Sequence, residues 1–435
     1  MIDAFWSPNP GSPAIAATSK SPPISRAMAA GPRCSPHLHP AASSGYQDRV
    51  TSSAPALDLP AAACALVPHV RRLAVLRANG IGDYVVAEPA LAALRAAYPE
   101  AEITLLGAGH HAALLQGRPG PVDRVVEIPA VPGVRVKSEV PDASADEVEA
   151  WCAEQRAYGY DLAIQLHGGG GNSNRLLLRL GARVTVGAAT PDAPKPDRWV
   201  PYTPYQHDTV RWLEVAAAAG AWGTRLEPVV AVTANDLAAS EAVVPVTDQP
   251  LVLVHPGATD ARRCYPEDRL GRVARALADR GAQVVVVGGA SEAARVASVA
   301  EGFGAKVQTV VGGLDLAGLV GTLARAALVL GNDSGPRHLA AAVGTPTVAV
   351  FTYANLADVA PLTRTWHRVL VSWHGGCQVC GMRVLDGWCG HGVSATHDVP
   401  ESEVRAAVLE LWSQVRARTR TSQIVALDAR GSRAI

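Results

Sequence analysis

The sequence has no apolar run of about 18 residues or more, so it predicts no membrane-spanning helix. It also has no excess of charge, because 39 Lys and Arg residues balance 39 Asp and Glu residues. That balance gives no basic footprint for nucleic acid. The seven cysteines are an odd number, and without a secretory signal they favour a reducing cytoplasm over a disulfide scaffold. We therefore expect a cytoplasmic protein whose membrane contact is at most peripheral.

The chain is long enough for two ordinary domains, with 435 residues of which 48% are hydrophobic and 18% charged. Pro, Ser and Ala dominate residues 1–66 without a helical or strand period. We interpret that segment as a disordered extension, or as sequence upstream of a later start such as Met28. We expect one domain over 67–240, a second over 241–418 and a flexible tail over 419–435.

Apolar strands alternate with helical segments in both halves. Residues 72–77 and 101–107 are typical of buried parallel strands, and 89–95 of the helix between them. A second sheet is expected to start at 251–254, so the pattern predicts an α/β protein with two doubly wound domains. Ligands of such sheets lie beyond the carboxyl ends of the strands. The proline-rich stretch 187–206 is expected to be a long loop beside one such edge.

The stretch 331–346 joins an apolar strand to a helix through a short polar loop that contains Asp333 and Ser334. Pro336 suits the first turn of that helix. A helix N-terminus presents free N–H groups and a positive dipole, which favour a phosphate. The alternative is that Asp333 or Ser334 only caps the helix and that His338 is packed.

A second loop, Gly80 to Asp83, follows the first strand. Its glycines allow the backbone to approach a ligand, and Asp83 stands at a strand-to-helix junction. The alternative is a simple helix cap. No spaced Gly-x-Gly-x-x-Gly follows this strand, which disfavours a dinucleotide oxidoreductase.

A third loop, 255–266, follows the first strand of the second sheet. Small residues, the hydroxyl of Thr259 and two arginines suit a diphosphate, which a guanidinium binds in bidentate fashion. Surface arginines before a helix are the alternative interpretation.

These loops resemble one family. The segments RRLAVLRANGIGDYVVAEPALAALRAAYPEAEITLL, HPGATDARRCYP and GNDSGPRHLAAAVGTPTVAVF are similar to the motifs of glycosyltransferase family 9, the ADP-heptose:lipopolysaccharide heptosyltransferases. The resemblance covers about residues 71–415. It implies a GT-B fold, with two Rossmann-like domains that face each other across a cleft.

The resemblance also implies roles. Asp83 matches the proposed general base, which would accept the proton of the acceptor hydroxyl. The acceptor-side loop contains Asn79, Gly80 and Gly82, where Asn79 replaces the small hydroxyl residue of many relatives. The positions that match the donor site are Thr259, Arg263, Glu292, Asp333, Ser334, Gly335 and His338. Glu292 would bind the ribose, although a first-turn Glu can also only complement a helix dipole.

The implied activity is inverting transfer of heptose from ADP-heptose to a glycolipid, saccharide or lipopolysaccharide-core acceptor. Arg263 and the helix N-terminus would stabilise the leaving nucleoside diphosphate, so no cofactor or catalytic metal is expected. Two alternatives stay open. One is a glycosyltransferase with another nucleotide sugar and a cell-wall or small-molecule acceptor, and the other is a non-catalytic nucleotide-sugar binding protein.

A cysteine-rich segment follows the last strand of the second half. Cys377, Cys380, Cys389 and His391 provide four sulfur or nitrogen ligands of the kind that a structural zinc ion uses. The close spacing of Cys389 and His391 is unusual for zinc, and relatives often have cysteines here. A loop without metal is therefore the alternative.

Overall fold

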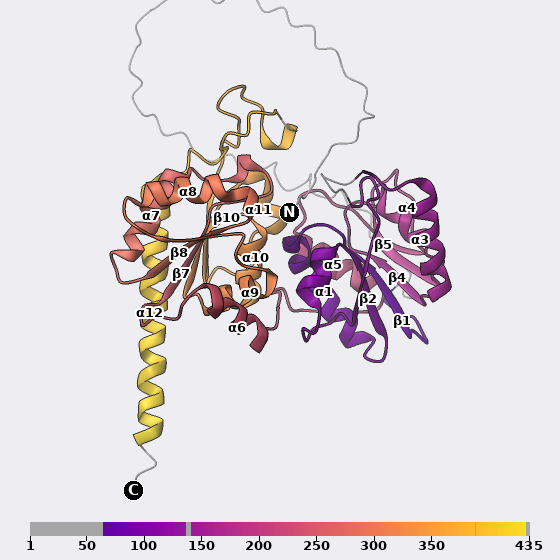
Figure 1. The fold of residues 1–435 in the computed structure, drawn as a ribbon. Coiled ribbons are helices and arrows are strands. Elements are labelled where there is room, and N and C mark those ends of the chain that lie inside the picture. Colours follow the sequence, from indigo (N-terminus) through magenta and orange to yellow (C-terminus); the bar gives the residue numbers. More distant parts are fainter. Residues whose placement is uncertain (1–63, 136–140, 388, 432–435) are drawn as a thin grey trace, which may run out of the picture. The chain divides into compact units, whose positions relative to one another are not determined.

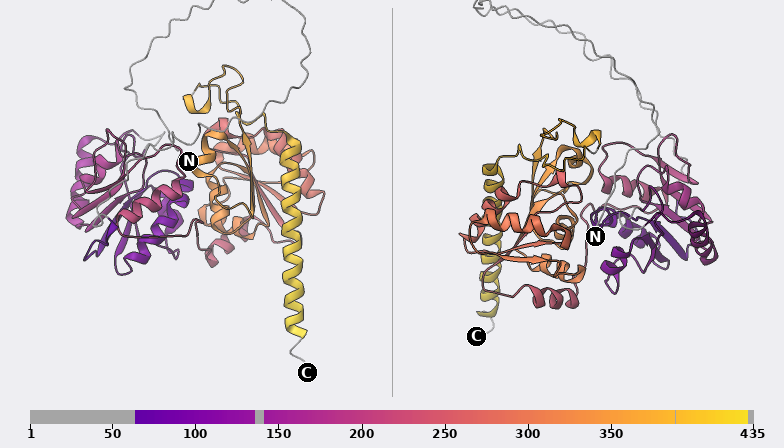
Figure 2. Two further views of the ribbon diagram at one scale, coloured as in Figure 1. Left: turned by 180° about the vertical axis from the view of Figure 1, so that it is seen from behind. Right: turned by 45° about the horizontal axis from the view of Figure 1, so that its top comes forward.

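The computed structural model describes residues 64–135, 141–387 and 389–431, with side chains up to residue 418. The expectations for residues 1–63 lie outside this range. Two parallel six-stranded sheets form the framework, and helices cover both faces of each sheet (Figures 1 and 2). The predicted α/β class is confirmed.

The first sheet has the strand order β3-β2-β1-β4-β5-β6. Its elements are β1 (Arg72–Leu76), α1 (Ile81–Ala97), β2 (Glu102–Gly107), α2 (Gly109–Leu115), β3 (Arg124–Glu127), α3 (Ala145–Tyr158), β4 (Leu162–Gln165), α4 (Ser173–Leu178), β5 (Val184–Ala189), β6 (Arg198–Pro201) and α5 (Asp208–Ala218).

The second sheet has the order β12-β11-β10-β7-β8-β9, which repeats the first order when each half is numbered from its own first strand. Its elements are α6 (Ala234–Val243), β7 (Leu251–His255), η2 (Ala261–Arg263), α7 (Glu267–Ala278), β8 (Gln283–Gly288), η3 (Ala290–Glu292), α8 (Ala293–Phe303), β9 (Gln308–Val311), α9 (Leu316–Arg325), β10 (Leu328–Asn332), α10 (Gly335–Ala342), β11 (Thr347–Thr352), α11 (Tyr353–Val359), β12 (His367–Ser372), η4 (Val384–Asp386) and α12 (Glu401–Gly431).

The strands are apolar because both faces of each sheet are covered. Val252 and Val254 of β7 belong to one core cluster, whereas Leu253 points into the other. This alternation follows from the two-residue period of a strand. In each sheet the chain reverses its direction of winding between two central strands, β1 and β4 or β7 and β10. Ligands of doubly wound sheets bind at such switch points.

Three expectations about element bounds need correction. Helix α1 begins at Ile81 and not at Pro89, so Asp83 lies in its first turn. The stretch 187–206 is not a continuous loop, because β6 pairs there with β5. Helix α12 continues to Gly431, into the segment 419–435 that was expected to be a flexible tail.

Helix α6 packs on α9 of the second half. Gly321 of α9 permits this close approach, since a Cβ atom on it would stand 1.9 Å from the carbonyl oxygen of Asp236. The domain boundary expected at residue 240 falls inside α6. Within the described ranges, no helix has the length and apolarity needed to cross a membrane.

Candidate functional site

Asp83 lies at the carboxyl edge of the first sheet, in the first turn of α1. Gly80 precedes the helix, and its backbone N–H donates to Oδ2 of Asp83 at 3.0 Å. The Asp83 side chain is 31% exposed. Its carboxylate is therefore both fixed by the loop and accessible from outside.

Arg77 is a second charged residue at this edge, and none of the sequence motifs predicted it. It is buried, and its Nη2 donates to Oδ1 of Asp83 at 3.1 Å while its Nε donates to the Asp83 carbonyl at 3.0 Å. The only signal in the sequence was a charged side chain at the carboxyl end of a predicted apolar strand, 72–77.

His167 and Asn79 lie beside this loop. The backbone N–H of Ala78 donates to Nδ1 of His167 at 3.3 Å. Burial, together with the charge of Arg77, lowers the pKa of His167 to about 3, so its imidazole is neutral. The carbonyl of Asn79 is bonded to Nε2 of His110 at 2.9 Å. The Asn79 Oδ1 atom is buried and has no hydrogen-bond partner among the described residues.

Asp333 is the centre of the second half of the site. Its carboxylate is buried and receives hydrogen bonds from Arg263 Nη1 at 3.1 Å and from Asn355 Nδ2 at 2.6 Å. Burial alone raises the pKa of this carboxyl group. The hydrogen bond from His338 and the charge of Arg263 outweigh that effect, and the net pKa lies well below its ordinary value. Asp333 is therefore ionised and orients Arg263.

His338 follows one turn later on α10. Its Nε2 lies 3.3 Å from Oδ1 of Asp333, and Arg337 donates to its ring. Burial and the charge of Arg337 lower the pKa of His338 to about 4, so the ring is neutral near pH 7. A neutral ring can donate one hydrogen bond without adding charge.

Glu292 and Ser334 meet at His255. The ring of His255 has its Nε2 3.3 Å from Oε2 of Glu292 and its Nδ1 3.3 Å from Oγ of Ser334. Burial raises the pKa of Glu292, but the bond to His255 reverses the direction and lowers it overall. Gly257 makes room for this carboxylate, because a Cβ atom there would stand 1.5 Å from Oε1 of Glu292.

The two halves of the site meet at the N-termini of α1 and α10, which pack against each other. A Cβ atom on Gly82 would stand 2.9 Å from Cδ2 of His338, and one on Gly335 would stand 3.9 Å from the backbone nitrogen of Gly82. Ser334, one of the two expected N-cap residues, is the residue before α10, and its side chain makes no capping hydrogen bond. Thr259 lies exposed on the loop after β7.

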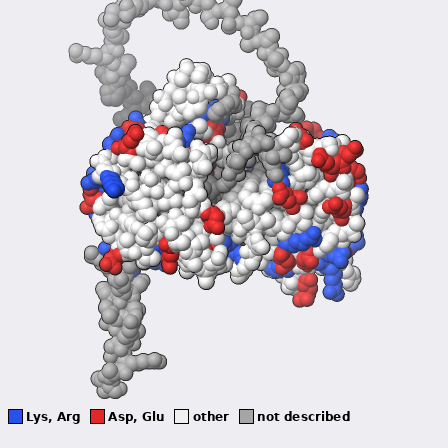
Figure 3. Space-filling view, viewed as in Figure 1, with Lys and Arg blue, Asp and Glu red and all other residues white. Residues whose placement is uncertain are grey.

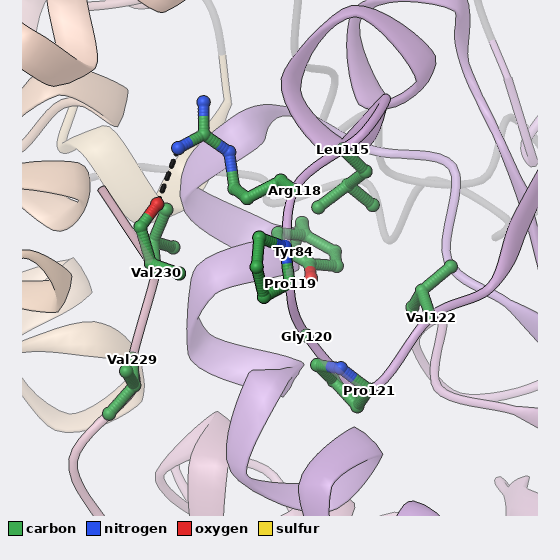
Figure 4. A pocket seen from close by; sticks show the side chains of 10 residues that line it. Tyr84, Leu115, Arg118, Pro119, Gly120, Pro121, Val122, Val229 and Val230 are labelled. Carbon is green, nitrogen blue, oxygen red and sulfur yellow. Dashed lines mark hydrogen bonds between the residues drawn. The ribbon is translucent and has the colours of Figure 1, made fainter. Parts of the chain in front are cut away.

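A small pocket lies on another side of α1. Tyr84, Leu115, Arg118 and the segments 119–122 and 229–231 line it (Figure 4). Arg118 donates to the Ala231 carbonyl. Its walls are mostly apolar, and none of the candidate site residues lines it. On the face drawn in Figure 3, acidic and basic side chains stand close together, so neither sign covers that face.

The cysteine segment forms one cluster. The ligand atoms of Cys377, Cys380, Cys389 and His391 all lie within 4.8 Å of one another. Sγ of Cys377 is 3.6 Å from Nδ1 of His391. A hydrogen bond with the backbone of Cys380 is the main cause that lowers the pKa of the Cys377 thiol to about 6. This donor set can hold a metal ion in tetrahedral geometry.

Comparisons with known proteins agree on the fold. The profile of glycosyltransferase family 9 (heptosyltransferase) matches residues 152–383, a range that begins after Asp83. Lipopolysaccharide heptosyltransferase 3 of Escherichia coli (strain K12) is 33% identical over 130 residues, which is 29% of this chain and 37% of that relative.

Two solved structures are similar over most of their length. The glycosyl transferase family 9 protein from Veillonella parvula DSM 2008 has a TM-score of 0.62 at 19% identity, over 79% of this chain and 97% of its own. E. coli heptosyltransferase WaaC with ADP has a TM-score of 0.58 at 20% identity, over 78% and 99%. At such identities the likeness establishes the GT-B fold alone.

Proposed function

Because the chain belongs to glycosyltransferase family 9, the heptosyltransferase family, we propose that it transfers heptose from ADP-heptose to an acceptor hydroxyl. The acceptor would be a glycolipid or saccharide like the lipopolysaccharide core. The observation that supports this most is the arrangement of charges at the two switch points. An accessible carboxylate, Asp83, lies on α1, and a carboxylate-oriented cation, Arg263, lies beside α10.

In this proposal the diphosphate of the donor binds at the N-terminus of α10, where N–H groups and the helix dipole favour an anion. Arg263 donates to it and is held in position by Asp333. Glu292 accepts hydrogen bonds from the ribose hydroxyls. The charge that develops on the leaving ADP is stabilised by Arg263 and by the backbone.

The acceptor hydroxyl approaches from the side of Asp83. Its oxygen attacks the anomeric carbon while Asp83 takes its proton, and the bond to the diphosphate breaks. This single displacement inverts the anomeric centre. The close approach of Gly82 and His338 supports the proposal that base and donor site belong to one reaction centre.

A nucleotide-sugar binding panel separates the open alternatives. Purified full-length protein is melted with ADP-heptose, ADP, and UDP- and GDP-linked sugars, because a bound ligand raises the melting temperature by mass action. We expect a selective response to the adenine compounds. A response to UDP- or GDP-sugars alone would keep a transferase but overturn the heptosyl donor. No response from folded protein would overturn the proposed function.

The first mutational prediction concerns catalysis. Asp83→Asn removes the proton acceptor and keeps the shape, so we expect kcat to fall by roughly 10²–10⁴-fold while the ADP-heptose melting shift stays. Transfer is measured as ADP release that depends on acceptor. Asp146→Asn, an exposed carboxylate on α3 in the same half, is the control and should keep its activity. Wild-type rates in Asp83→Asn would show that another group is the base.

We further propose that the Cys377, Cys380, Cys389 and His391 cluster binds zinc as a structural ion. Three thiolates and one imidazole are a common donor set for structural zinc, and a closed set of four leaves no position for substrate. The ion would fix the loop 377–391, whose described part has η4 as its only helical turn.

The second prediction tests this ion by its content. Protein purified without added metal should contain about one zinc per chain by elemental analysis. Cys380→Ser should lose the zinc and lower the melting temperature by several degrees, whereas Cys64→Ser, outside the cluster, should change neither. A metal-free wild-type protein with an unchanged melting temperature would contradict the proposal, and iron in place of zinc would correct its identity.

A further inference from the structure

We propose that Arg77 is the residue that positions the catalytic carboxylate of Asp83. This inference rests on the proposed function, in which Asp83 is the base. Arg77 does not contact the reacting atoms. It acts through Asp83, and Asp208 in turn orients Arg77.

Arg77 holds Asp83 at two places. Its Nη2 binds Oδ1 of the side chain at 3.1 Å, and its Nε binds the backbone carbonyl of the same residue at 3.0 Å. The second oxygen, Oδ2, accepts the Gly80 N–H at 3.0 Å. Each carboxylate oxygen can accept a further bond. Both oxygens are therefore anchored, and a lone pair remains for the acceptor hydroxyl.

Arg77 is itself immobilised. Its side chain is 2% exposed, and Nη1 donates to the Leu166 carbonyl at 2.7 Å. Its guanidinium lies over the ring of Trp212 at 5.0 Å from the centroid. The planar guanidinium thus uses Nε, Nη1 and Nη2 at once, which a lysine ammonium cannot do with the same geometry.

Asp208, at the start of α5, completes the arrangement. Its Oδ2 lies 3.4 Å from Nη2 of Arg77, and its Oδ1 accepts a bond from Arg211. Arg211 also donates to the carbonyls of Thr203 and Gln206 at 2.9 and 2.8 Å. Charges of opposite sign alternate along Asp83, Arg77, Asp208 and Arg211. This alternation compensates the burial of two guanidinium groups.

A purely structural ion pair would need no accessible member. Here the series of charges ends at its more exposed carboxylate, since Asp83 is 31% exposed and Asp208 15%. A base must be held close to its productive geometry, because a displacement of about 1 Å can lower a rate by roughly 10²-fold. The network supplies that restraint from behind the carboxylate.

The test compares Arg77→Met with Arg77→Lys. Arg77→Met keeps the length of the stem and removes every donor, so we expect kcat to fall by roughly 10- to 100-fold. The KM for ADP-heptose and its melting shift should stay within about twofold, because the donor contacts are elsewhere. Arg77→Lys restores one donor and should recover part of kcat. A merely structural role would not produce this split between kcat and KM, nor the recovery.

Arg95→Met is the matched control. Arg95 also binds several backbone carbonyls and a carboxylate, Asp123, but at the far end of α1 from Asp83. It should reproduce any general loss of stability without the loss of kcat. If Arg77→Met does not fold, Asp208→Asn decides, with an expected several-fold fall in kcat at unchanged KM.

The outcomes separate the two proposals. Wild-type transfer that Asp83→Asn abolishes and Arg77→Met leaves at the wild-type kcat would overturn this inference alone. A loss in Arg77→Met that Arg95→Met shares, or that appears equally in the KM for the donor, would also overturn it. Absence of transfer by the wild type would overturn the proposed function and this inference together.

Discussion

At the scale of single residues, the absence of a side chain on Gly257 allows the Glu292 carboxylate to lie against the backbone. Its backbone lies so close to that carboxylate that a methyl group would overlap Oε1 at 1.5 Å. Gly257→Ala should therefore push Glu292 away from its place between His255 and the Gly289 N–H. If Glu292 binds the ribose, the affinity for ADP should fall about tenfold, which corresponds to roughly 1.4 kcal/mol.

Calorimetric titration with ADP measures this effect directly. Gly120→Ala is the matched control, because a Cβ atom at Gly120 meets no other atom within 4 Å. It should bind ADP like the wild type. Unchanged ADP affinity in Gly257→Ala would argue that Glu292 does not contact the nucleotide.

Other residues of the site show how far sequence patterns reach. Asp333 and His338 could be proposed because they lie within one contiguous motif. Their partner Asn355 could not, because it comes from α11, and only the fold brings its amide to 2.6 Å from Asp333. His255 was visible only as the first residue of the loop 255–266. Contacts between elements depend on strand order, which a single sequence does not determine.

At the scale of elements, the sequence predicted the bounds of strands more accurately than the ends of helices. The predicted strands at 72–77, 101–107 and 251–254 agree with β1, β2 and β7 to within one residue. The helical segment expected at 89–95 covered only part of α1, which begins at Ile81. Pro89 lies inside the helix. Its missing N–H removes one backbone hydrogen bond, and the hydrogen bonds of the other turns maintain the helix.

The edge strand β6 and the helix α6 were missed for a different reason. Strand β6 is short and lies between prolines, and it is defined by its pairing with β5, as in Gly187 with Trp199. Helix α6 has no strong apolar face of its own, and it is placed by the backbone contact of Asp236 with Gly321. In both cases a distant partner, and not the local pattern, determines the element.

At the scale of the whole molecule, the two sheets share one strand order. The segments with candidate site residues therefore follow equivalent strands in the two halves. The segments that directly follow β1 and β4 contain Asp83 and His167, and those that follow β7 and β10 contain Arg263 and Asp333. Each half also contains buried histidines that are neutral near pH 7. Burial is the main cause that lowers the pKa of His167 to about 3, and of His338 and His367 to about 4.

These histidines predict that the protein loses stability in mild acid. In the unfolded chain a histidine takes up a proton near pH 6.5, whereas in the folded chain it stays neutral until about pH 4 or below. Between these values the unfolded state binds more protons, so the free energy of unfolding falls as the pH falls. In this range each histidine lowers the free energy of unfolding by up to about 1.4 kcal/mol per pH unit. The contribution of these histidines to the free energy of unfolding is fully present above about pH 6.5 and decreases toward pH 4.

Thermal melting at pH 7, 6 and 5 measures this loss, and we expect the midpoint to fall by roughly 10 °C or more over that range. His367→Gln removes one of the three groups and can keep a bond to Oγ1 of Thr347, so its midpoint should depend less on pH. His69→Gln, at an exposed position, should keep the wild-type dependence. A wild-type midpoint that stays constant from pH 7 to 5 would show that these rings take up protons in the folded state as readily as in the unfolded one.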